Sequence, residues 1–339
     1  MGLLSAAHVH ADGYLDVLAA SPDVALAGLW DEDAARGAEI AERHGTRFFA
    51  SEQALFGERL DGVVVASVNS EHRRLTELAA AAGVHVLCEK PLATRVEDAH
   101  AMLEACAAAG VLLMTAFPMR FSPVISELER AIRGGKLGEL VCLEGVNTGQ
   151  IPDRERPWFT DPALSGGGAV TDHVVHLADA YRWLLDAEVV EVYAVANRIL
   201  RDRFADVETG GLVSLRFENG VFATIDCSWS KPPSYPTWGG LSIEAVGSAG
   251  IITADAFRQR LSLYGPADGG VSWPAWGSNS DVAMVGEFVA AIRERRQPAV
   301  TGLDGLRAVE IVAAAYRSIE SGEPVRLERD SSEALGLRA

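Results

Sequence analysis

Asp172 and His176 are the residues whose types and spacing point most directly to chemistry. They follow three glycines at 166–168 and stand four residues apart, so a helix formed there carries both on one face. A neutral imidazole suits removal of a hydroxyl proton near physiological pH, and the Asp172 carboxylate would position the substrate or the base. The alternative interpretation is an ordinary surface helix that begins at these residues.

His173 adds a second histidine three residues before His176, where it would face the same site and contact the substrate. The two histidines also suggest a metal pair. Their spacing is three and no third ligand is evident nearby, so no metal site is predicted.

Lys90 belongs to a Glu-Lys-Pro sequence at the end of a short apolar run, residues 84–88. Ligands of doubly wound sheets bind at the carboxyl ends of strands. A lysine there can donate to a substrate oxygen and stabilise a developing alkoxide. An exposed lysine at a strand end is the alternative.

Ser5, Ala7 and His10 occupy the first strand-to-helix turn, where a dinucleotide site normally has three glycines. Ser5 and Ala7 are small enough to keep the turn narrow, so its amides would still face a phosphate. Asp31 follows the next apolar run, where an acidic residue binds ribose hydroxyls and repels a 2′-phosphate. NAD is therefore favoured over NADP, and a simple helix N-cap is the alternative role for Asp31.

Short apolar runs alternate with amphipathic stretches over the first 115 residues, which predicts a doubly wound parallel sheet. The expected strands are residues 3–4, 24–30, 48–49, 63–66, 84–88 and 111–115. The expected helices include residues 71–82 and 94–109, the second with a capping box from Thr94 and Glu97.

After a helix that starts at Ser122-Pro123 and another near residues 169–185, strand-like runs follow one another directly. They cover residues 189–197, 211–217, 221–228, 241–246 and 251–254. Asn219-Gly220 predicts a hairpin. The region is therefore expected to form a large, mostly antiparallel open sheet in an α+β domain, closed by helices near 281–295 and 303–321.

The predicted domains are a Rossmann domain over residues 1–119 and a substrate-binding and oligomerisation domain over residues 120–339. Helices are available for only one face of the second sheet, so its apolar open face needs a cover. A homodimer or homotetramer is expected.

The chain has 339 residues and a formal net charge of −17. An acidic surface of this kind is repelled by phosphate backbones and anionic lipids, so nucleic acid and membranes are not expected partners. Four scattered cysteines and the absence of a leader-like or membrane-spanning stretch favour a cytoplasmic protein.

The order of these motifs is similar, along nearly the whole chain, to the glucose–fructose oxidoreductase/inositol dehydrogenase (Gfo/Idh/MocA) family. The resemblance rests on residues 83–94, 119–123, 165–176, 218–220 and 227–230. It implies a Rossmann domain followed by a sheet domain, and a catalytic set of Lys90, Asp172 and His176. The first turn departs from the family pattern in its missing glycines.

The resemblance also implies that residues 67–72 pass near the nicotinamide, although Val68 stands where a proline is expected. The cofactor-binding residues expected from the turn, the acidic position and the resemblance are Ser5, Ala7, His10, Asp31, Ser67, Asn69, His72, Glu89 and Lys90. Substrate contacts are expected from Lys90, Arg120, Trp158, Asp172, His173 and His176.

Aromatic rings at Trp158, Trp229, Tyr235 and Trp238 would stack on a sugar ring or serve as core residues. Arg120, Arg154 and Arg156 would bind an acidic sugar or remain solvated. The predicted function is an NAD-dependent dehydrogenase of a sugar, cyclitol or polyol. Two alternatives stay open: redox-assisted elimination or glycoside cleavage with bound NAD, and a non-catalytic sugar or NAD sensor.

Overall fold

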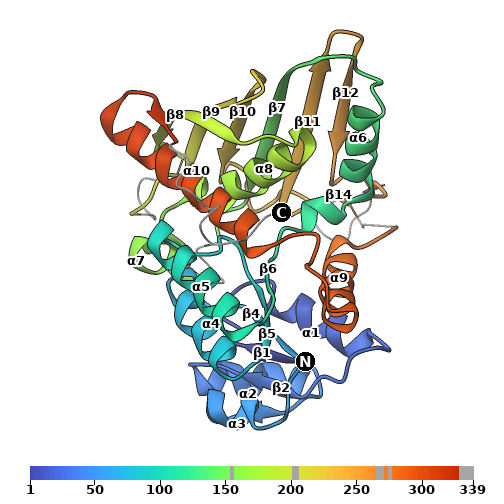
Figure 1. The fold of residues 1–339 in the computed structure, drawn as a ribbon, viewed down its shortest axis with the longest axis vertical. Helices are drawn as coiled ribbons and strands as arrows, with labels where there is room; N and C mark the ends of the chain where they lie inside the picture. The colour runs from blue at the N-terminus through green and yellow to red at the C-terminus, as the bar shows by residue number, and fades with distance from the viewer. Residues whose placement is uncertain (153–155, 201–205, 265–270, 274–276, 328–339) are drawn as a thin grey trace. The chain divides into compact units, whose positions relative to one another are not determined.

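The computed structural model describes residues 1–152, 156–200, 206–264, 271–273 and 277–327 (Figure 1). The chain divides into two compact units. The first contains Met1–Phe121, Pro152–Gly166 and Asn279–Val309, and the second contains Ser122–Ile151, Gly167–Ser278 and the chain from Glu310 onward. Each unit has its own sheet.

The first unit is built on a six-stranded parallel sheet with the order β3-β2-β1-β4-β5-β6. Its strands are β1 (Gly2–Leu4), β2 (Gly28–Trp30), β3 (Phe48–Phe49), β4 (Gly62–Val65), β5 (His85–Cys88) and β6 (Leu113–Thr115). The strand order reverses between β1 and β4, which is the switch point at which doubly wound sheets bind ligands. The predicted Rossmann architecture is confirmed.

Helices of the first unit alternate with these strands. They are α1 (Ala11–Ala20), α2 (Ala34–Arg43), α3 (Glu52–Phe56), α4 (His72–Ala81) and α5 (Val96–Ala109). Helix α9 (Ser280–Glu294) comes from late in the chain and packs against α1. Short helical turns complete the unit: η1 (Asn69–Glu71), η2 (Pro118–Phe121), η3 (Pro157–Thr160) and α7 (Pro162–Ser165).

Two local predictions for this unit are wrong. Strand β2 begins at Gly28 rather than Val24, and a Cβ on Gly28 would lie 2.2 Å from the Arg47 carbonyl oxygen. Helix α5 begins at Val96 with Arg95 as an N-cap that makes no side-chain cap bond, so the predicted Thr94–Glu97 capping box does not form. The side chain of Thr94 instead packs closely against Gly166.

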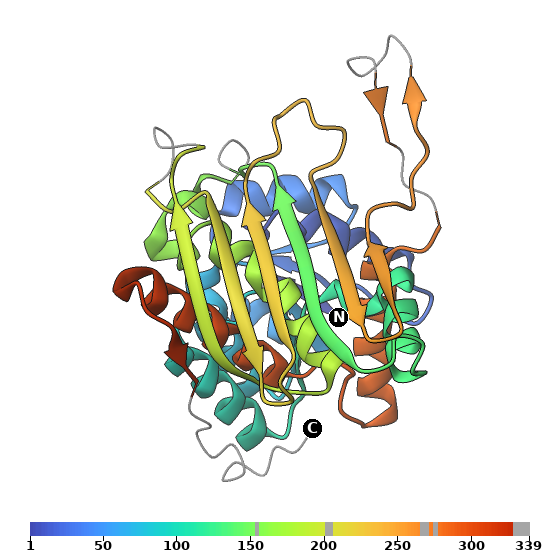
Figure 2. The same cartoon turned by 90° about the horizontal axis from the view of Figure 1, so that it is seen from above.

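The second unit contains a seven-stranded sheet with the order β12-β11-β7-β10-β9-β8-β15 (Figure 2). Its strands are β7 (Leu140–Gly149), β8 (Val189–Asn197), β9 (Gly210–Phe217), β10 (Phe222–Ser228), β11 (Gly239–Gly247), β12 (Gly250–Asp255) and β15 (Val325–Arg326). All neighbours are antiparallel except β7 and β10. The mostly antiparallel sheet is confirmed, but its central strand β7 was not predicted. A separate pair consists of β13 (Leu263–Tyr264) and β14 (Val271–Ser272).

The predicted hairpin at Asn219-Gly220 joins β9 to β10, with Arg216 opposite Phe222. Gly220 has a φ of 87°, and the Val221 amide donates to Oδ1 of Asn219. An L side chain rarely adopts that conformation, which is why glycine stands there.

Helix α8 (Ala169–Leu185) packs on β7, β9 and β10, while α6 (Pro123–Arg133) packs against β12. Ser122 precedes α6 with proline at N1 as predicted, but its hydroxyl makes no cap bond. Helix α10 (Gly302–Ser321) begins in the first unit and ends in the second. Among the helices of the described ranges, none combines the length and apolarity that crossing a membrane requires.

Candidate active site

The first turn of the Rossmann unit uses most of its own amides. The Ala6 amide donates to Oδ2 of Asp31 at 2.7 Å, and the Ala7 amide donates to Oγ of Ser5 at 3.2 Å. The His8 amide donates to the Ala66 carbonyl at 2.9 Å. Ser5 itself has a φ of 66°. The turn therefore differs from a glycine-rich cradle, in which free amides face a phosphate.

Asp31 stands at the end of β2, as predicted, but it is not a helix cap, because Asp33 caps α2. Its side chain is buried and accepts from the Asp33 amide at 2.7 Å. Arg36 binds both of its oxygens, through Nε at 3.0 Å and Nη2 at 2.7 Å. Ribose recognition by Asp31 stays a prediction. The Arg36 guanidinium would lie beside the Asp31 carboxylate in such a site.

Ser67, Asn69 and His72 lie in or beside the loop after β4 and are all buried. Asn69 Nδ2 donates to the Ser165 carbonyl at 2.8 Å, and His72 Nδ1 lies 2.9 Å from the Pro91 carbonyl oxygen. Burial lowers the pKa of His72. These contacts connect the loop after β4 to Ser165 and Pro91. Contacts of Ser67, Asn69 and His72 with the cofactor stay predictions.

Glu89 and Lys90 follow β5 and are both buried. Glu89 Oε1 accepts from the Tyr14 hydroxyl at 2.5 Å and lies 2.8 Å from His10 Nδ1, while Oε2 accepts from the Lys90 amide at 3.0 Å. Burial alone would raise the pKa of Glu89, but the adjacent His8 and His10 rings and Lys90 bring it well below its usual range. The carboxylate is therefore an anchor for the first turn, next to the predicted catalytic lysine.

Asp172 and His176 lie on α8, and both are partly exposed on the face that their spacing predicts. Trp229, which is fully buried, donates from Nε1 to Oδ2 of Asp172 at 3.0 Å. His173 is buried instead, and its backbone carbonyl accepts from Asn147 Nδ2 at 3.1 Å. A Cβ on Gly149 would lie 3.1 Å from the His173 ring. Within this helix, His173 packs toward the sheet.

The glycines before α8 permit close packing. A Cβ on Gly167 would lie 2.0 Å from the Tyr316 hydroxyl, and one on Gly168 would lie 2.0 Å from the Glu208 carbonyl oxygen. The Glu208 carboxylate accepts from the amides of Gly168 and Val170 at 3.0 and 2.9 Å, and from the Tyr316 hydroxyl at 2.8 Å. Burial raises the pKa of Glu208, although these hydrogen bonds act to lower it. A carboxylate thus caps the helix that carries Asp172 and His176.

The two remaining residues predicted to contact the substrate, Arg120 and Trp158, make contacts with other residues of the protein. Arg120 pairs with Asp304 at 2.8 Å. The Trp158 indole is buried, stacks on Phe159 at 3.9 Å between centroids, and donates to the Ala7 carbonyl at 3.0 Å. Substrate contacts by these two residues stay predictions.

The other aromatic and arginine candidates differ in exposure. Trp229 is a core residue, whereas Trp238 is 43% exposed and the Tyr235 ring lies 4.1 Å from Lys231 Nζ. Arg154 lies outside the described residues. Sequence reasoning missed the partnership of Trp229 with Asp172, because 57 residues separate them.

Comparison with known proteins identifies the class. Residues 7–117 match the oxidoreductase family with an NAD-binding Rossmann fold, and residues 125–253 match the GFO/IDH/MocA C-terminal domain. A myo-inositol 2-dehydrogenase of Thermotoga maritima is 30% identical over 79% of this chain and 80% of its own length. The chain belongs to the Gfo/Idh/MocA family of NAD(P)-dependent oxidoreductases.

Two further relatives span most of the chain. A 1,5-anhydro-D-fructose reductase of Ensifer adhaerens is 28% identical over 89% of this chain and 91% of its own length. The crystal structure of GenD2 from gentamicin A biosynthesis, in complex with NAD, is 25% identical. It covers 96% of both chains with a TM-score of 0.88. The resemblance stated from the motifs is confirmed.

Proposed function

We propose that this protein is a dehydrogenase that oxidises a hydroxyl carbon of a sugar, cyclitol or polyol and reduces the corresponding carbonyl. The observation that carries the proposal is the Asp172–His176 pair on the partly exposed face of α8, with Asp172 oriented by the buried Trp229. The relatives named as an inositol dehydrogenase and an anhydrofructose reductase support this substrate class.

The residues of the first unit fit a nicotinamide dinucleotide. The strand order reverses at β1 and β4, and Asp31 stands at the end of β2, where an adenosine ribose is bound in such folds. Ser5, Ala6 and Ala7 are small, which keeps the turn after β1 narrow beside Asp31. We assign the ribose to Asp31 and the nicotinamide side to the loop of Ser67 and Asn69.

The proposed roles follow from the chemistry of each side chain. The His176 imidazole removes the hydroxyl proton during oxidation and returns it during reduction. The Lys90 ammonium donates to the same oxygen and stabilises negative charge on it. The Asp172 carboxylate holds the substrate and orients the base. Bound NAD would supply the hydride acceptor for the carbon that carries this oxygen.

We further propose that NAD is preferred over NADP, that the protein acts in the cytoplasm, and that it forms a homodimer or homotetramer. The carboxylate of Asp31 supports the cofactor preference, because it would repel a 2′-phosphate. The four cysteines are free and buried, which is consistent with a reducing compartment.

A panel of inositols, aldoses and polyols incubated with NAD tests the function through the absorbance of the reduced cofactor. We expect at least one panel member to give turnover that Lys90→Ala abolishes or strongly reduces. Binding of a panel sugar and NAD without turnover would instead indicate a sensor. Conversion of a glycoside without net cofactor reduction would indicate the elimination chemistry.

A further inference from the structure

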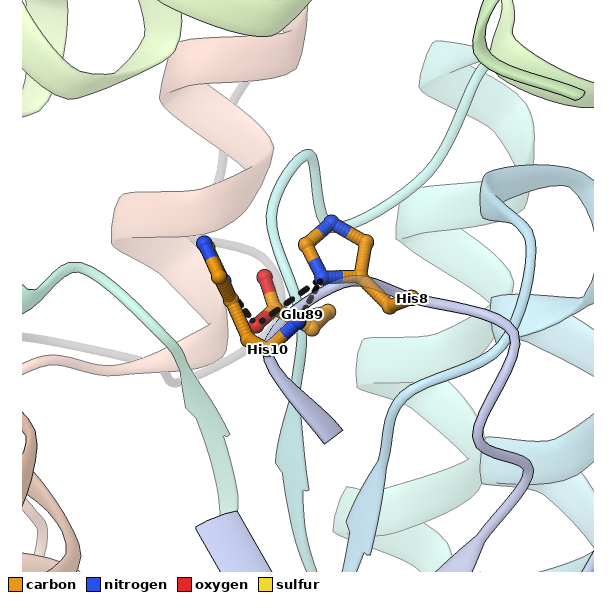
Figure 3. A group of neighbouring side chains, drawn as sticks. All are labelled: His8, His10 and Glu89. Carbon is orange, nitrogen blue, oxygen red and sulfur yellow. Dashed lines mark hydrogen bonds and ion pairs between the residues drawn. The ribbon is translucent and has the colours of Figure 1, made fainter. Parts of the chain in front are cut away.

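His8 and His10 in the turn after β1 lie beside Glu89, which follows β5 and is 79 residues from His10 in the sequence (Figure 3). Glu89 Oε1 is 2.8 Å from His10 Nδ1 and 3.6 Å from His8 Nδ1. One donor atom from each of the three side chains lies within 4.8 Å of the other two. All three residues belong to the first compact unit.

We propose that His8, His10 and Glu89 form a binding site for one divalent transition-metal ion of the Zn²⁺ class. Two imidazole nitrogens and one carboxylate oxygen are the ligand types that Zn²⁺ accepts in open, three-ligand sites. Tetrahedral ligands about 2.0–2.1 Å from a metal are separated by about 3.3 Å. The two distances to Oε1 lie on either side of that separation, and the two histidine donor atoms lie within 4.8 Å of each other, so the side chains must draw together to hold an ion.

Two of the three ligands are held rigidly. The side chains of His8 and Glu89 are each 1% exposed. The Trp158 and Phe159 rings lie beside the His8 ring, with centroids 6.0 and 5.4 Å away. Buried ligands whose rotamers are locked by packing lose little entropy when they bind a metal.

The carboxylate also has the supporting bonds that a metal ligand needs. The Tyr14 hydroxyl donates to Oε1 and the Lys90 amide donates to Oε2. Such outer partners fix the orientation of a ligating carboxylate. The backbone amide of His10 donates to His8 Nδ1 at 3.3 Å, so Nδ1 is the unprotonated nitrogen, and a metal bound there replaces this long hydrogen bond.

His10 gives the site its access to solvent, because its side chain is 43% exposed. An ion can enter past this ring, and a water molecule can occupy the fourth position. The cluster lies at the turn whose own amides are already bonded within the protein. A cation held there supplies positive charge where this chain lacks the free amides of a glycine-rich turn.

Zinc titration of tag-free, chelator-treated protein by isothermal calorimetry tests the proposal without any nicotinamide cofactor. Its failure therefore leaves the proposed dehydrogenase activity untouched. We expect one ion per chain with a Kd of ~1 µM or tighter. Replacing Zn²⁺ with Co²⁺ should produce the visible absorption bands of a nitrogen- and oxygen-ligated ion.

His10→Asn is the principal variant, because the exposed ring can be replaced without disturbing the core. It should weaken Zn²⁺ binding by at least about 10-fold, since loss even of an outer-shell partner costs 10–100-fold. His44→Asn is the matched control, because His44 contacts Asp12 and Asp16 in the same unit but not Glu89. Absence of a stoichiometric site, or equal binding by wild type and His10→Asn, would overturn the proposal and leave the cluster as a hydrogen-bonded brace.

Discussion

The indole Nε1 of Trp229 donates a hydrogen bond of 3.0 Å to Oδ2 of Asp172, which lies 57 residues earlier in the sequence. Because Trp229 is fully buried, its indole is fixed in place and can position the carboxylate. A hydrogen bond to a charged group contributes about 1.5–3 kcal/mol. The side chain that orients the predicted catalytic carboxylate is thus a core residue of the sheet domain.

Trp229→Phe tests that contact. The variant keeps an aromatic ring but loses the donor, so Asp172 can rotate away from its productive orientation. We expect kcat to fall by roughly 10–100-fold, which corresponds to about 1.5–3 kcal/mol. Steady-state kinetics measures the effect, and Asp172→Asn completes a double-mutant cycle. Purely additive losses would show that Trp229 acts through packing and not through Asp172.

His176→Asn should lower turnover by ~10²–10⁴-fold, the range for loss of a positioned acid–base group. Cofactor affinity should change little, because α8 belongs to the second unit. His173→Asn is the internal control. His173 is buried and its Nε2 lies 3.6 Å from Asp172 Oδ2, so its replacement should reduce thermal stability and lower turnover far less than His176→Asn does. If His176→Asn keeps near-normal turnover while a folded His173→Asn is inactive, His173 and not His176 is the general base.

Asp31→Asn tests cofactor preference. The amide oxygen can still accept from the Ala6 amide, but the negative charge disappears and Arg36 becomes available for a 2′-phosphate. We expect NAD to bind the wild type more tightly than NADP, and the ratio of the two Kd values to shift by ~10-fold toward NADP in the variant. Calorimetric titration measures both.

Glu32→Gln is the control for this experiment, because Glu32 also pairs with Arg36 but is partly exposed. It should leave the preference unchanged. Tighter binding of NADP than NAD by the wild-type protein would refute the role given to Asp31.

Glu208→Gln should change how stability depends on pH. Because burial raises the pKa of Glu208, the folded state binds a proton more readily than the unfolded state. Its contribution to stability is therefore present below the unfolded pKa and declines as pH rises toward the folded pKa. The glutamine variant does not titrate, so it should gain stability relative to wild type as pH rises from the unfolded pKa of a glutamate through the raised folded pKa of Glu208.

Urea unfolding at several pH values measures this difference, with the exposed Glu104→Gln as a charge-matched control. Glu208→Ala should destabilise the protein by about 1–3 kcal/mol at any pH, because the amides of Gly168 and Val170 lose their acceptor. Parallel pH profiles for wild type and Glu208→Gln would contradict the assignment.

Leu212→Asp tests the oligomer. Leu212 and Val195 are paired across β9 and β8 and are 50% and 48% exposed on the open sheet face. An apolar face of this kind needs a cover, so a charge placed there should convert the dimer or tetramer into monomers. Light scattering measures the mass. Val282→Asp, on α9, is the exposed apolar control and should keep the wild-type mass. A monomeric wild type would refute the prediction.

Short-range sequence patterns were enough to predict the fold class and the helix face that carries the candidate site residues. Alternating apolar runs and helices give a parallel sheet because a strand buried on both faces must be continuously apolar, as residues 63–65 are. Spacing of four put Asp172 and His176 on one helix face, and Asn219-Gly220 set one hairpin register. These features depend on short-range geometry, which a sequence pattern specifies directly.

Tertiary structure alone decided which side chains meet across long separations. Strand β7 supplies the parallel partner of β10, although the strands predicted for the second sheet began only at residue 189. Thr94 does not have its expected capping role, because Arg95 occupies the N-cap position of α5, and the Thr94 side chain packs against Gly166. Glu89 contacts His8 and His10 because the ends of β5 and β1 reach the same edge of the sheet. Asp31, at the end of β2, accepts from the Ala6 amide for the same reason, and it also pairs with Arg36. No local periodicity encodes such meetings, because they depend on the order in which strands pair.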